Sequence, residues 1–324
     1  MTLPSQTDDS QRKYFHTAAQ TLLHYGGSAL VLYLLFRLLP GRQVWQTLGL
    51  LPARLWVMVL AGYFAAHCIG VGKWRLMVNV AGAGLNVRQA AQCYFAGLFG
   101  SLFLPSLIGG DIVRAGLALR LGRSKAGVLL GSFLDRMIDF AALTLLAGVG
   151  ALLIPGALDA RGRKIFLLLG AGALLGAVAV AGVIALLPVG RFSFRMRRRV
   201  VRVRRAGRSM ARQPGAMLRA LSLGVVAQLL FIELSVLLAK ACGLDLPFCV
   251  WLFAWPLAKL SAALPITQGG IGVREAALAA LLAPFGAPAV LTVAAGLAWE
   301  AIVVSGAVVA GAASLLIARA SGGE

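Results

Sequence analysis

The residues best suited to chemistry in this sequence are charged side chains inside long apolar segments. Asp135, Arg136 and Asp139 lie within the apolar stretch 126–154, and the two aspartates, four residues apart, share one face of a helix. Charged groups inside a membrane are costly and usually either pair with one another or serve a function. Two interpretations stay open: an ion pair that fixes helix packing, and a polar cavity wall where Arg136 meets a phosphate.

Further polar residues occupy apolar segments nearer the C-terminus. Gln228 and Glu233 lie in one such segment, Lys259 lies in the next, and Glu300 lies mid-way along the last one. Glu300 follows a helix-breaking phrase much as Asp135 follows an earlier one. These positions are candidates for a polar interior or for packing pairs.

The helix-breaking phrase occurs twice. Residues 104–114 read LPSLIGGDIVR and residues 264–274 read LPITQGGIGVR, so both fit L-P-x-x-x-G-G-x-x-V-R. Proline removes a backbone donor and glycine lowers helix stability, so each phrase should interrupt a helix. Broken segments at matching places in two halves of a chain point to a transporter's substrate site. The alternative is a chance match in a glycine- and leucine-rich chain. The predicted breaks are Pro105, Gly109, Gly110, Pro265, Gly269 and Gly270.

Arg114 and Arg274 are the equivalent basic residues of the two phrases. The planar guanidinium group binds phosphate oxygens through two parallel hydrogen bonds, which suits a lipid headgroup. The alternative for each arginine is an anchor at the membrane interface. The full set of predicted headgroup-binding residues is Arg114, Arg136, Arg274, Asp111, Asp135, Asp139, Glu275 and Lys259.

The elements that must position these residues are membrane helices. Of the 324 residues, 60% are hydrophobic and 13% are charged, against about 25% charged in soluble domains. The runs 55–72, 89–108 and 165–187 contain no charge, and about 20 apolar residues span a bilayer. The chain is therefore predicted to be an all-α polytopic membrane protein. The candidate segments are 22–39, 55–72, 89–108, 126–154, 165–187, 220–239, 247–263, 276–284 and 290–318.

The distribution of positive charge favours a topology with two re-entrant hairpins. Positive residues concentrate in cytoplasmic loops, and a hairpin that turns back near Pro105 places most of them on one side. The predicted loops 73–88, which begins with Lys73, and 109–125 then share the cytoplasmic face. We predict six full transmembrane helices, re-entrant broken-helix hairpins at about 89–125 and 247–286, and both termini in the cytoplasm. An odd number of crossings separates the two hairpins, which makes them an inverted repeat.

The predicted domain spans residues 22–319, between an N-terminal tail at 1–21 and a C-terminal tail at 320–324. The net charge is +20, and the loop 188–219 is rich in arginine and contains no acidic residue. This loop is predicted to be cytoplasmic, and it would also suit anionic lipid headgroups. No nucleic-acid recognition module accompanies the arginines, so a nucleic-acid partner is not expected.

Catalytic chemistry is not indicated by the sequence. It contains no nucleophile elbow, no metal-binding cluster of histidine and cysteine, and no phosphate-binding loop of the P-loop type. We therefore predict neither a metal nor a cofactor, and no enzymatic activity. The four cysteines are predicted to be small buried hydrophobic residues.

Two stretches resemble the signature regions of a known family. Residues 102–140 contain Pro105, Gly109, Gly110, Asp111 and Arg114, followed by the pair Asp135 and Arg136. Residues 264–288 contain the phrase L-P-x-x-x-G-G-x-G-x-R-E, which ends at Arg274 and Glu275. These stretches are similar to the lysylphosphatidylglycerol synthase transmembrane-region family, also called the flippase-like family.

The resemblance implies a bacterial or archaeal plasma-membrane protein that handles phospholipids or glycolipids. In the multiple peptide resistance factors this region moves aminoacylated phosphatidylglycerol between leaflets, and a separate soluble domain performs synthesis. We expect no such aminoacyltransferase domain here. The first hypothesis is a translocase for a lipid with an anionic or modified headgroup. The alternative is a non-catalytic subunit that presents lipid to a glycosyltransferase or lipid synthase, and a third is a membrane-embedded enzyme. Homo-oligomers are compatible with all three.

Overall fold

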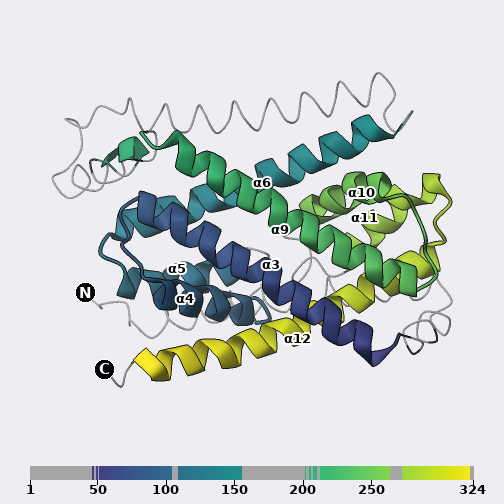
Figure 1. The fold of residues 1–324 in the computed structure, drawn as a ribbon, viewed down its shortest axis with the longest axis horizontal. Helices are drawn as coiled ribbons and strands as arrows, with labels where there is room; N and C mark the ends of the chain where they lie inside the picture. Colours follow the sequence, from purple (N-terminus) through teal and green to yellow (C-terminus); the bar gives the residue numbers. More distant parts are fainter. Residues whose placement is uncertain are drawn as a thin grey trace, which may run out of the picture.

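The structure is a computed structural model that describes residues 51–103, 109–154, 212–262 and 272–321, with positions 46, 49, 201, 204, 205 and 207–209. Every regular element in these residues is helical (Figure 1). Several predictions concern residues outside the described ones: segments 22–39 and 165–187, most of the basic loop, and the breaks at Pro105, Pro265, Gly269 and Gly270.

Four helices are long and apolar enough to cross a membrane. They are α3 (Ala53–Val80), α6 (Lys125–Leu153), α9 (Pro214–Ala241) and α12 (Ala289–Ser321). The 28 residues of α3 rise about 42 Å, which exceeds the hydrocarbon core of about 30 Å and allows a tilted crossing. The described part of the chain thus agrees with an all-helical integral membrane protein. Helix α9 begins inside the predicted loop 188–219.

Four shorter helices form two pairs. In the first pair, α4 (Val87–Gly100) packs on α5 (Gly109–Leu121). In the second pair, α10 (Phe248–Ser261) packs on α11 (Val273–Leu282). A 3-10 turn, η3 (Ala283–Phe285), follows α11. All four are too short to cross a bilayer with about 20 residues.

The pair α4–α5 is a tightly packed antiparallel hairpin. A Cβ atom on Gly97 would lie 2.7 Å from the carbonyl oxygen of Gly110, so only glycine allows this approach of the two backbones. Just beyond α5, the amide of Arg123 donates to the carbonyl of Ala83, 2.8 Å away and shortly before α4. The chain therefore returns to the level at which α4 began.

The helices repeat in register. Helices α3 and α9 each have 28 residues, and α4 and α10 each have 14. In both pairs the second helix begins 161 residues after the first: α3 begins at residue 53 and α9 at 214, and α4 begins at residue 87 and α10 at 248. Both long helices end in the same turn. Gly82 and Gly243 have φ of 93° and 87°, a conformation that glycine favours at a helix end. The next amides, of Ala83 and Leu244, each donate at 2.9 Å to a carbonyl five residues earlier.

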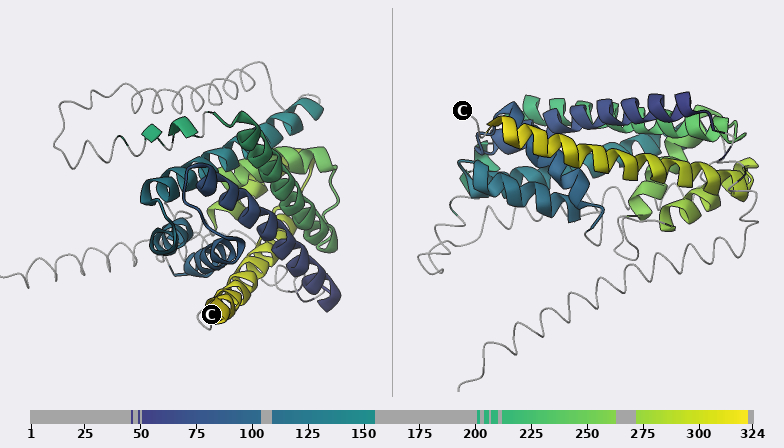
Figure 2. Two further views of the ribbon diagram at one scale, coloured as in Figure 1. Left: turned by 60° about the vertical axis from the view of Figure 1, so that its left-hand side comes forward. Right: turned by 90° about the horizontal axis from the view of Figure 1, so that it is seen from below.

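The two copies are related by an approximate half-turn. Helices α3 and α9 run antiparallel, because Gly62 faces Leu234 while Gly224 faces Lys73. Each hairpin packs on the last helix of the other copy, α4 on α12 and α10 on α6, and the hairpins lie on opposite sides of the crossing (Figures 1 and 2). An axis relating two antiparallel helices is perpendicular to both of them. Both helices that the axis relates are long and apolar enough to cross a membrane.

Candidate functional site

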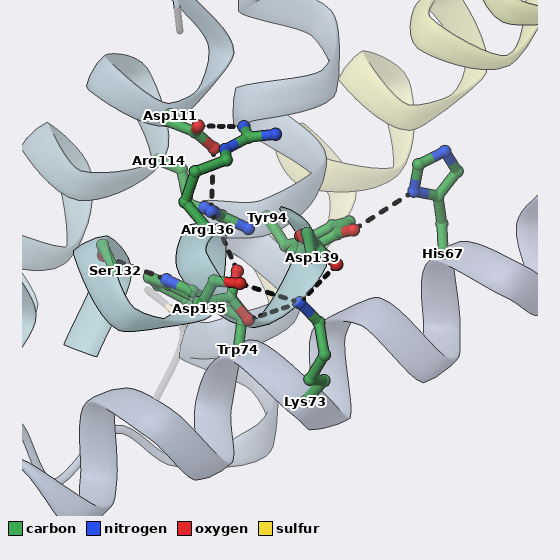
Figure 3. Close-up of polar contacts among 10 residues, drawn as sticks. All are labelled: His67, Lys73, Trp74, Tyr94, Asp111, Arg114, Ser132, Asp135, Arg136 and Asp139. Carbon is green, nitrogen blue, oxygen red and sulfur yellow. Dashed lines mark hydrogen bonds and ion pairs between the residues drawn. The ribbon is translucent and has the colours of Figure 1, made fainter. Parts of the chain in front are cut away.

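Six charged side chains from α3, α5 and α6 meet inside the bundle, and we call them the first cluster (Figure 3). Three are cations and three are carboxylates, so the cluster has no net charge. All its members come from the first copy of the repeat. They are Lys73, Asp111, Arg114, Asp135, Arg136 and Asp139.

Lys73 joins the two aspartates of α6. Its Nζ lies 2.8 Å from Asp135 Oδ1 and 2.8 Å from Asp139 Oδ1. The spacing of four residues presents both carboxylates to one lysine, as the shared helical face predicted. Our assignment of Lys73 to a loop was wrong: α3 continues to Val80, and Lys73 is only 3% exposed. The apolar run stops at this charge, but the ion pairs allow the helix to bury it.

The arginines of the first cluster are also paired. Arg114 Nη2 lies 2.8 Å from Asp111 Oδ1 and 3.3 Å from Asp135 Oδ2, while Arg136 donates to Asp111 Oδ2. The Arg114 guanidinium also lies 5.0 Å from the ring centre of Trp74 and 5.1 Å from that of Tyr94. The Nε atoms of both arginines are buried and have no hydrogen-bond partner among the described residues.

A second, smaller cluster lies in the other copy of the repeat. Arg274 Nη2 lies 2.6 Å from Glu275 Oε1 and 2.8 Å from Glu300 Oε2. The other oxygen of Glu275 accepts from the amide of Gly272 at 2.7 Å, at the start of α11. This second cluster (Arg274, Glu275 and Glu300) therefore holds one cation and two carboxylates.

The two clusters share one arrangement. In each copy, the arginine of the repeated phrase binds a carboxylate on the long helix that follows: Asp135 on α6 for Arg114, and Glu300 on α12 for Arg274. The phrase arginine also binds a carboxylate in the first turn of its own short helix, Asp111 or Glu275. The predicted correspondence of Asp135 with Glu300 is therefore present in the ion pairs.

Lys259 lies apart from both sets of ion pairs. Its Nζ donates to Gln228 Oε1 at 2.9 Å and lies 4.8 Å and 4.7 Å from the ring centres of Phe231 and Trp255. Among the described residues it forms no ion pair with a carboxylate. The sequence singled out Lys259 and Gln228 separately, and the structure brings them together.

Comparison with known proteins gives one match. Residues 21–311 match the model of the family described as the lysylphosphatidylglycerol synthase TM region. The chain belongs to this family. No curated protein and no solved structure gives a significant match. Membership confirms the resemblance drawn from the repeated phrases and places the chain among membrane proteins of lipid metabolism.

The structure places residues at the site that were not predicted from the sequence. Lys73 was counted as a loop charge, and the rings of Trp74 and Tyr94, which face Arg114, were not considered. Helical spacing could have found Lys73, because Trp74, Met77 and Val78 continue the buried face of the same helix beyond it.

The predicted polar residue Glu233 lies away from the clusters. Glu233 is exposed on α9, and the nearby Lys240 pairs with Asp245 at 3.4 Å, at an exposed position. Gly109 and Gly110 form the first residues of α5, and Gly110 provides the close contact with α4. All eight predicted headgroup residues except Lys259 belong to the two clusters.

The described part of the basic loop lines a surface cavity of about 580 Å³. Ser209 attaches it to the end of α3, because its hydroxyl donates to the carbonyl of Val80 at 3.0 Å. The lining contains no acidic residue, so the cavity suits an anion. The arginines that line it are Arg204, Arg205, Arg208 and Arg212.

Proposed function

We propose that the protein is a translocase that moves a lipid with an anionic or modified headgroup between the leaflets of a bacterial or archaeal plasma membrane. The observation that carries this proposal is the pair of short-helix hairpins, related by a half-turn, that each bring a phrase arginine onto a carboxylate inside the bundle. Charged residues in a membrane interior are expensive and usually line a substrate path. Translocation moves the lipid without changing it chemically.

The headgroup would pass between the two clusters while the acyl chains stay in the bilayer. Arg114, Arg136 and Arg274 are the phosphate-binding candidates, and the unpartnered Nε atoms of Arg114 and Arg136 offer donors that the ion pairs leave unused. The carboxylates keep the arginines in place when no lipid is bound. Net neutrality of the first cluster lowers the cost of burying it.

The proposed topology has six full spans, two re-entrant hairpins and cytoplasmic termini. Two observations support it: α4 and α5 are each too short to cross, and the contact between Arg123 and Ala83 returns the chain to its starting level. The four long described helices and the apolar segments 22–39 and 165–187 supply the six spans.

Leaflet exchange in reconstituted vesicles tests the proposal. Fluorescent phosphatidylglycerol and phosphatidylcholine are placed in vesicles with the wild type, Arg114→Ala, Arg274→Ala, or the control Arg219→Ala, whose arginine is exposed on α9. We expect lipid exchange with the wild type and the control. Exchange should be slower with each of Arg114→Ala and Arg274→Ala that is recovered as folded protein. Wild-type vesicles that exchange no faster than protein-free vesicles would contradict the proposal.

The arginine-lined cavity favours a second candidate, a subunit that docks a lipid-modifying enzyme. Its four arginines could bind an acidic surface of such a partner. Replacing Arg204, Arg205 and Arg208 by glutamine would then abolish function in cells but leave lipid exchange in vesicles unchanged. Loss of exchange in that variant would argue against the docking role.

A further inference from the structure

The two copies of the repeat meet at the midpoints of α3 and α9. The ring of His67 on α3 lies against that of Phe231 on α9, with ring centres 5.1 Å apart and ring planes tilted by 59°. His67 and Gln228 occupy equivalent positions 161 residues apart. Both positions lie near the middle of helices of 28 residues. Inverted-repeat transporters hold their substrate near the bilayer midplane at the interface of the repeats.

Lys259 brings a positive charge to this meeting point. Its Nζ is hydrogen-bonded to Gln228 and lies over the rings of Phe231 and Trp255. The side chain belongs to a half-buried residue. The parts of the two repeated phrases that lie outside the described residues, 104–108 and 264–271, include no Asp or Glu, so neither brings a carboxylate to it.

The charges that act most strongly on Lys259 already have ion-pair partners of their own. The charges within electrostatic reach are those of Asp139, Arg136, Arg274 and Lys73, and Asp139 is already bound to Lys73. Each of the phosphate-binding candidates Arg114, Arg136 and Arg274 also has at least one carboxylate partner. A phosphate that binds an arginine must compete with that carboxylate, whereas among the described residues the partners of Lys259 are a neutral amide and two rings. Charge-assisted hydrogen bonds are about twice as strong as neutral ones.

We propose that Lys259 is the central phosphate-binding residue, on which a phospholipid headgroup rests half-way through its passage. The ion-paired arginines hold the two hairpins in place around it and bind the phosphate before and after this midpoint. This inference rests on the proposed translocation and names the residue that contacts the substrate. Since Lys259 has no equivalent in the first copy, where Leu98 occupies the matching position, the site is single and both leaflets share it.

Two substitutions at Lys259 isolate the charge. Lys259→Met removes the ammonium but keeps a flexible apolar stem, and it leaves no carboxylate unpaired, so the variant should fold. Lys259→Arg keeps the charge. The matched control is Lys240→Met, which removes an exposed lysine of α9. In vesicles of phosphatidylcholine with a trace of fluorescent phosphatidylglycerol, we expect Lys259→Met to slow phosphatidylglycerol exchange about tenfold or more. Lys259→Arg and the control should remain within about threefold of the wild type, the usual scatter of such effects.

Binding is measured separately as the rise in the thermal unfolding midpoint that a soluble probe causes. Short-chain phosphatidylglycerol should stabilise the wild type and Lys240→Met but not Lys259→Met. Glycerol phosphate is the second probe. Stabilisation by the short-chain lipid alone identifies a lipid site, and stabilisation by both probes identifies a site for the phosphate group itself.

The outcomes separate this inference from the proposed function. Wild-type exchange with unchanged exchange in Lys259→Met overturns the inference and leaves translocation standing. If the wild type exchanges no lipid, translocation fails, and the binding measurement alone decides the role of Lys259. Equal stabilisation of wild type and Lys259→Met by phosphatidylglycerol then overturns the inference as well.

Discussion

Replacing Arg274 by methionine should destabilise the protein strongly, because one guanidinium group is the ion-pair partner of two carboxylates. Glu275 and Glu300 lie 2.6 Å and 2.8 Å from it, and the three side chains are only 16%, 0% and 18% exposed. Removing one partner of a buried ion pair costs about 3–5 kcal/mol, since the remaining charge is left uncompensated. That is a large part of a total stability of about 5–15 kcal/mol.

A second substitution tests the cause. In Arg274→Met with Glu300→Gln, one of the two unpaired carboxylates is gone, so the double variant should recover at least about 1 kcal/mol relative to additive single effects. The measurement is unfolding by a denaturing detergent in mixed micelles, followed by tryptophan fluorescence. Arg219→Met, which removes an exposed arginine, is the matched control. Two results would refute the assignment of Arg274 as the partner of both carboxylates. One is a loss in the free energy of unfolding below about 1 kcal/mol in Arg274→Met, and the other is strict additivity of the effects of Arg274→Met and Glu300→Gln.

Two further predictions follow from backbone packing and hairpin geometry. Gly150→Ala should destabilise the protein by about 1–3 kcal/mol, because the new Cβ would lie 2.4 Å from the Phe253 amide nitrogen. Gly116→Ala has nothing within 4 Å of the new Cβ and should stabilise the protein by about 0.5–1 kcal/mol. Equal effects of the two substitutions in the same unfolding assay would contradict this. Single cysteines at Val87 and Arg120, both exposed positions, should react with an impermeant thiol reagent from the same side of the membrane when the native cysteines are replaced. Labelling from opposite sides would contradict the re-entrant hairpin α4–α5.

Much of the framework could be predicted from the sequence. Hydropathy identified the four long helices, and the repeated phrase identified both short-helix hairpins and the family, which the match over residues 21–311 confirms. The spacing of Asp135 and Asp139 predicted a shared face, and Lys73 binds both. These features are local: helix periodicity and chain breaks are set by residues within a few positions of one another.

The extent of the repeat needed the structure. The sequence shows the repeated phrase of eleven residues, whereas the matching lengths of α3 with α9 and of α4 with α10 extend the repeat to units of four helices. Side chains at equivalent positions differ, as His67 and Gln228 do, because the half-turn requires similar helix shapes and not similar residues. The breaks at Pro105 and Pro265 lie outside the described residues and remain predictions.

The sequence by itself determined the class of protein and which charges lie within apolar segments, because both depend on local composition. Only the tertiary structure decided how these charges are compensated. Lys73 finds its carboxylates on a helix 62 residues away, and Arg274 is shared by two glutamates. Within the described part of the chain, Lys259 meets Gln228 and aromatic rings and no carboxylate. Ion pairing requires contact within about 4 Å, and the packing of distant helices sets that distance.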